Sequence, residues 1–132
     1  MTKKILIVAG IIGALSIVMD ALGNLYFFDF IPDSDETLYN HAVLYQIIHA
    51  LALIGLVFLN RYFKPKYINV IFFMLVGGVI LTSGTMYLLS LEELFKYEFK
   101  VLKPFTAIGG VLLIIGWLGI ANLGINYKSK KR

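Results

Sequence analysis

The sequence has no cysteine, and only 15% of its 132 residues are charged. Without cysteine the chain forms neither a disulfide nor a thiolate metal site. An average soluble domain is about 25% charged and about 45–50% apolar, whereas this chain is 59% hydrophobic with a mean hydropathy of +0.82. Because there is too little polar surface to cover a water-soluble globule of this length, the composition indicates an integral membrane protein.

Proline is also scarce, and its positions divide the chain. Pro32, Pro65 and Pro104 fall between long apolar runs, where helices end or begin. Four runs, over residues 5–28, 38–60, 68–91 and 105–127, have the roughly 20 residues needed to cross a bilayer as a helix. Since single strands would leave backbone groups unsatisfied in lipid, we expect an all-α bundle of four transmembrane helices, forming a single membrane domain over residues 1–132.

The two ends of these spans differ in charge. At one end, two loops connect spans one and two and spans three and four. These loops contain seven of the eight acidic residues and only three basic ones. The other end holds nine basic residues: Lys3, Lys4, Arg61, Lys64, Lys66, Lys128, Lys130, Lys131 and Arg132. The positive-inside rule therefore predicts a multi-pass protein of the cell membrane with both termini in the cytoplasm. Several tyrosines, Tyr39 among them, fall near the predicted span ends, where amphipathic rings settle.

Polar residues interrupt the apolar runs at similar depths. The stretch "AVLYQIIHALALIGLVFL" carries Gln46 and His49 on one helical face. At about 1.5 Å of rise per residue, Asp20 in the first span and Ser83 in the third lie at the depth of His49. We therefore predict that Asp20 and His49 pair inside the bundle, either as a functional site or to hold helices together. The predicted polar interhelical layer comprises Asp20, Asn24, Gln46, His49, Thr82, Ser83, Thr85 and Tyr87.

Small residues in membrane spans are typical of positions where helices approach closely. Trp117 lies too deep for an interfacial belt, and its indole N–H needs a partner. Ser16 lies at a similar depth and is the expected acceptor. The predicted helix-packing residues are Gly13, Ser16, Gly23, Gly84, Gly109, Gly110, Gly116 and Trp117.

Three stretches, "YQIIHALALIGL", "LTSGTMYLLSL" and "AIGGVLLIIGW", resemble a family of small bacterial membrane proteins known as domain of unknown function 423. The resemblance spans most of the chain in the same four-helix order and implies a fold and a location rather than an activity. The family's first span carries a histidine where this sequence has Leu25, which argues against a site that needs two histidines. The positions carried over are Tyr45, Gln46, His49, Ser83, Gly84, Tyr87, Gly109, Gly110, Gly116 and Trp117.

Three functions can be weighed against this pattern. The favoured one is a non-enzymatic accessory or scaffold bundle associated with lipid, since small-residue stripes and interhelical hydrogen bonds are its expected features. The alternative is a proton-coupled transporter of small molecules or ions using Asp20 and His49. An intramembrane hydrolase with Ser83 as nucleophile lacks a recognisable nucleophile motif. We expect no metal, no cofactor and no nucleic-acid partner, and we expect membrane lipid as a partner, with a homo-oligomer or another membrane protein as a further possibility.

Overall fold

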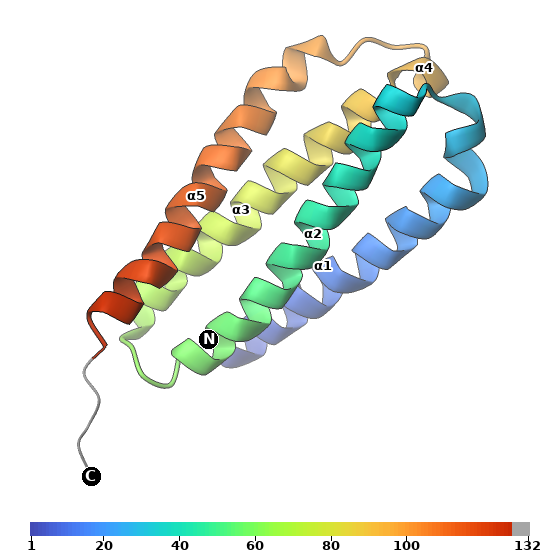
Figure 1. Cartoon of the computed structure of the whole chain (residues 1–132). Helices are drawn as coiled ribbons and strands as arrows, with labels where there is room; N and C mark the ends of the chain where they lie inside the picture. Colours follow the sequence, from blue (N-terminus) through green and yellow to red (C-terminus); the bar gives the residue numbers. More distant parts are fainter. Residues whose placement is uncertain (128–132) are drawn as a thin grey trace.

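Four long helices form a bundle in the computed structural model, which describes residues 1–127, and each runs antiparallel to the long helix before it (Figure 1). They are α1 (Thr2–Leu22), α2 (Asp33–Leu59), α3 (Pro65–Ser90) and α5 (Lys103–Ile125). All four are long and apolar enough to cross a membrane. No strand occurs between residues 1 and 127. The all-α transmembrane bundle expected from the sequence is therefore confirmed.

The helices are arranged with α2 and α3 in the middle and α1 and α5 on the flanks (Figure 1). The principal contacts are of α1 with α2, of α2 with α3, and of α3 with α5. The chain enters α1 and leaves α5 at the same end of the bundle. At that end the Asn60 amide donates to the Thr2 hydroxyl at 3.0 Å, and the rings of Tyr62 and Tyr127 lie 5.9 Å apart. We call this the basic end.

Short helical segments complete the opposite end, which we call the acidic end. They are a π-helical turn (Gly23–Phe27) and a 3-10 turn (Phe28–Phe30) after α1, then α4 (Glu92–Phe95) and a second 3-10 turn (Lys100–Leu102) between α3 and α5. The prolines act as expected. Pro65 and Pro104 lie in the first turns of α3 and α5, where a missing N–H leaves no hydrogen bond unmade.

Gly23 explains how the π-helical turn packs. A Cβ at this position would lie 2.7 Å from the Phe28 ring and 2.8 Å from the Tyr39 ring. With no Cβ there, the fully buried Tyr39 reaches across to α1, and its hydroxyl donates to the Met19 carbonyl at 2.6 Å. Tyr39 is thus part of the interior, and the prediction that it lies with the interfacial tyrosines is wrong.

The interior consists of two clusters of buried apolar side chains. The larger runs from the basic end to mid-bundle and includes Leu53, Phe72 and Leu75. The smaller lies at the acidic end around Tyr39 and Tyr87, whose ring centroids are 4.9 Å apart. The predicted polar layer falls between and beside these two clusters.

Candidate functional site: the polar layer between the helices

Gln46 on α2 bonds to two other helices. Its Nε2 donates to the Ile12 carbonyl of α1 at 3.0 Å, and its Oε1 accepts from the Tyr87 hydroxyl of α3 at 2.7 Å. Both hydrogen bonds are buried. Leaving a buried polar group without a partner costs about 1–3 kcal/mol. The two bonds therefore favour the arrangement in which α1 and α3 both lie within reach of Gln46.

Hydroxyl groups of α3 form further links, to α2 and to α5. Ser83 Oγ donates to the Ala42 carbonyl at 2.9 Å and so links α3 to α2. The Thr85 hydroxyl contacts both the Thr106 hydroxyl of α5 and the Leu81 carbonyl of its own helix. Thr82 is buried as well, and its hydroxyl has no hydrogen-bond partner within residues 1–127. The predicted hydroxyls therefore lie inside the bundle, where three of the four helices share them.

His49 bonds through both ring nitrogens. Trp117 Nε1 of α5 donates to His49 Nε2 at 3.1 Å, and His49 Nδ1 lies 2.6 Å from the Tyr45 carbonyl one turn earlier. An indole N–H only donates, and a carbonyl only accepts. The imidazole in this arrangement is therefore neutral, with its proton on Nδ1. The expected bond from Trp117 to Ser16 is wrong, since the Ser16 hydroxyl donates to the Gly13 carbonyl of its own helix at 2.6 Å.

Asp20 and Asn24 lie outside this layer, contrary to the prediction. Both are exposed, and the Asn24 amide donates to the Asp20 side chain at 3.3 Å and to the Asp20 carbonyl at 2.9 Å. Equal depth along two helices does not fix the direction in which a side chain points. The side chain of His49 faces α5, whereas α1 packs on another side of α2, where Gly13 meets Ala50. The predicted pair of Asp20 and His49 is therefore not formed.

The predicted packing glycines divide into two groups. A Cβ on Gly109 would lie 2.6 Å from the Thr82 nitrogen and 2.9 Å from the Gly78 carbonyl, and one on Gly116 would lie 2.7 Å from Leu75. These positions hold α3 and α5 in close contact. A Cβ on Gly84 or Gly110 would meet no atom within 4 Å, so the prediction that these two are close-contact positions is wrong.

Two apolar grooves flank the layer on the outside of the bundle. One, of about 290 Å³, lies between α1 and α3 and has Gln46 and Ser83 at its base. The other, of about 360 Å³, lies between α2 and α5 and is lined by Tyr45, His49 and Trp117 together with aliphatic side chains. Trp117 is 45% exposed along this groove.

The chemistry available to the layer follows from these bonds. Ser83 donates to the Ala42 carbonyl, and both ring nitrogens of His49 are engaged. Residues 1–127 contain no group of three His, Cys, Asp or Glu side chains placed to hold a metal ion. Gln46, Ser83 and His49 thus each take part in a hydrogen bond that joins two helices.

Two residues outside the predicted layer also take part in this network. Tyr39 joins α2 to α1 through Met19, and Thr106 joins α5 to α3 through Thr85. The signal for Tyr39 is the glycine at position 23 on the facing helix, which leaves room for a ring. Thr106 lies in the first turn of α5, and the signal for it is a polar residue near the outer end of the fourth span.

Comparison with known proteins agrees with this architecture. The family model described as "Protein of unknown function (DUF423)" matches residues 19–110. The UPF0382 membrane protein YwdK of Bacillus subtilis is 29% identical over 94% of this chain and 98% of its own length. A UPF0382 membrane protein of Staphylococcus epidermidis is 32% identical over 87% of this chain and 90% of its own. No solved structure matches significantly.

Proposed function

The chain belongs to the DUF423 family of proteins of unknown function, and we propose that it acts in the membrane as a non-enzymatic accessory bundle associated with lipid. The observation that carries this proposal is the use of the interior polar groups. Gln46, Ser83 and His49 each give their side-chain bonding capacity to another helix or to backbone. Groups committed in this way stabilise one packing of the helices and are not free for acid–base or nucleophilic work.

Lipid is the partner that the outer surface favours. The grooves between α1 and α3 and between α2 and α5 are open and lined almost entirely by apolar side chains. Large aliphatic side chains on α1 such as Ile17, at 65% exposure, point away from the bundle. A surface of this kind is compatible with acyl chains, because lipid tails are as apolar as leucine.

Asp20 supports the accessory part of the proposal. A carboxylate on the outside of a membrane span costs about 2.5–3.5 kcal/mol at mid-membrane on insertion scales, less towards the interface. Asn24 alone is a weak compensation for this cost. A polar group of a protein partner, or of a second copy of the chain, would lower the cost further, so we propose the face of α1 that carries Asp20 and Asn24 as the contact for such a partner.

Flux and stability measurements on the purified protein test the proposal. Proteoliposomes are expected to show no proton or cation flux above that of empty liposomes, with or without the substitution Asp20→Asn. Gln46→Leu is expected to lower the free energy of unfolding by about 1–3 kcal/mol, because it leaves the buried Tyr87 hydroxyl without its acceptor and removes the bond to the Ile12 carbonyl. A flux that Asp20→Asn abolishes would replace the proposal with the transporter alternative.

A further inference from the structure

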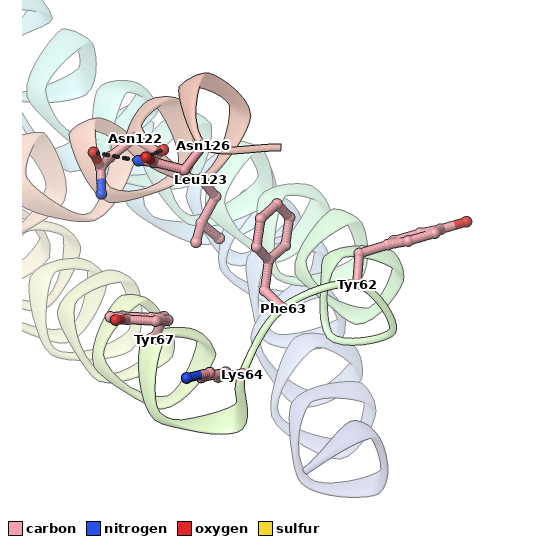
Figure 2. A pocket seen from close by; sticks show the side chains of 7 residues that line it. All are labelled: Tyr62, Phe63, Lys64, Tyr67, Asn122, Leu123 and Asn126. Atoms are coloured by element: carbon pink, nitrogen blue, oxygen red, sulfur yellow. Dashed lines mark hydrogen bonds between the residues drawn. The ribbon is translucent and has the colours of Figure 1, made fainter. Parts of the chain in front are cut away.

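A pocket of about 410 Å³ opens at the basic end, apart from the polar layer. It lies between the loop that joins α2 to α3 and the last turns of α5 (Figure 2). Phe63 and the buried Leu123 lie between its two polar sides. The pocket is lined by Tyr62, Phe63, Lys64, Tyr67, Asn122, Leu123 and Asn126.

The two sides of the pocket offer hydrogen-bond donors. On α5, the Asn126 amide donates to the carbonyl and side-chain oxygens of Asn122 at 2.8 and 3.1 Å, so that the Asn122 oxygens are occupied (Figure 2). The Asn122 amide N–H groups make no hydrogen bond within the described part of the chain. On the facing side, Lys64 and Tyr67 lie at the start of α3. Lys64 is the N-cap of that helix, where the helix dipole also favours negative charge.

The charge around the pocket has one sign. Among the described residues, the loops and helix ends at this end carry Lys3, Lys4, Arg61, Lys64 and Lys66 and no Asp or Glu. The ion pair present in residues 1–127, Lys100 with Glu98, lies at the acidic end. Lys64 is therefore not neutralised by a carboxylate of the described chain, and an anion entering the pocket meets no acidic neighbour.

We propose that this pocket binds the phosphate-bearing headgroup of an anionic phospholipid in the leaflet that faces the basic end. The pocket lies where the spans end, which is the level of the headgroups. Lysine and amide N–H groups suit a phosphate, while Phe63 and the tyrosine rings suit the boundary between headgroup and acyl chain. A soluble phosphate would share the donors but not the apolar floor formed by Phe63 and Leu123. The inference rests on the proposed lipid association and specifies its chemistry.

Native mass spectrometry of the full chain released from nanodiscs tests this site. The nanodiscs contain phosphatidylglycerol and phosphatidylcholine in equal amounts, and the wild-type protein is expected to retain phosphatidylglycerol preferentially. Lys64→Gln is expected to lower that preference about fivefold, because it removes the one cationic side chain among the residues that line the pocket and with it a charge-assisted bond to the phosphate. Lys66→Gln is the matched control. It removes the same charge two residues away, outside the pocket lining, and is expected to change the preference less than twofold.

The possible outcomes separate the two proposals. Equal losses for Lys64→Gln and Lys66→Gln would overturn the pocket in favour of a diffuse basic surface. Retention of both lipids without preference would overturn the headgroup site and leave lipid association standing, whereas retention of neither lipid would contradict both. Displacement of phosphatidylglycerol by millimolar inorganic phosphate would reassign the pocket to a soluble anion. Asn122→Leu, which keeps the charge and removes the amide donors, is expected to lower the preference as well.

Discussion

Trp117 Nε1 donates to His49 Nε2 at 3.1 Å and thereby joins α5 to α2 across the bundle. The rings meet edge to face, with centroids 6.0 Å apart. Because the other imidazole nitrogen contacts the Tyr45 carbonyl, the two partners together determine where the imidazole proton lies. The one histidine of the interior is therefore a neutral link between helices in this structure.

This relationship predicts a specific tautomer and a specific loss of stability. Nitrogen-15 NMR of the wild-type protein at neutral pH is expected to show His49 protonated at Nδ1 and unprotonated at Nε2. Trp117→Phe keeps an aromatic ring but removes the donor, and it is expected to lower the free energy of unfolding by about 0.6–1.7 kcal/mol. The stability is measured by denaturation in mixed micelles followed by circular dichroism. A doubly protonated imidazole at neutral pH would contradict the assigned bond.

The close contact of α3 with α5 predicts that alanine substitutions at two adjacent glycines, Gly109 and Gly110, differ in their effect on the free energy of unfolding. In Gly109→Ala the new methyl group would lie 2.6 Å from the backbone nitrogen of Thr82. Backbone cannot move aside as a flexible side chain can, so we expect a loss of about 1–3 kcal/mol in the free energy of unfolding.

Gly110→Ala is the control for that substitution, because its methyl group meets no atom within 4 Å. Its effect is expected to stay within about 0.5 kcal/mol. The same denaturation experiment measures both variants. Equal losses for the two would mean that the helices do not meet at Gly109.

The number and type of the helices could be predicted from the sequence because the lipid requirement is strong. A run of about 20 apolar residues has few alternatives to a spanning helix, and prolines mark the breaks. Burial of Gln46, His49 and Ser83 was likewise predictable, since polar side chains in a span usually face other helices. These predictions depend on the position of a residue along its helix.

Pairings between helices could not be predicted in the same way, because they depend on the direction of each side chain around the helix axis. Depth alone pairs Asp20 with His49, yet His49 faces α5 and Asp20 lies on the exposed surface of α1. The same argument pairs Trp117 with Ser16, although the Ser16 hydroxyl bonds within its own helix. The order of helices around the bundle, with α5 beside α3 and near α2, is the information that the depth argument lacks.

The exposed position of Asp20 predicts that it contributes little to the stability of the isolated protein. Asp20→Asn keeps the side-chain shape and removes the charge, and we expect the free energy of unfolding in detergent to change by less than about 0.5 kcal/mol. Gln46→Leu, inside the bundle, is the comparison and is expected to lose more. A large loss for Asp20→Asn would mean that the carboxylate has an intramolecular partner.

Chemical cross-linking from α1 in the native membrane, compared between the wild type and Asp20→Asn, tests the proposed partner face.

The absence of cysteine makes the orientation of the chain directly measurable. The basic end is predicted to face the cytoplasm, since the sequence pattern assigns nine of the twelve Lys and Arg residues to that side of the membrane. Four of the nine, Lys128, Lys130, Lys131 and Arg132, lie outside the described residues. Single-cysteine variants at Arg61, in the loop between α2 and α3, and at Lys96, after α4, place one label at each end. In intact cells a membrane-impermeant maleimide is expected to modify Lys96→Cys, and to modify Arg61→Cys only after the membrane is permeabilised. The reverse pattern would put the basic end outside and would move the proposed headgroup site to the other leaflet.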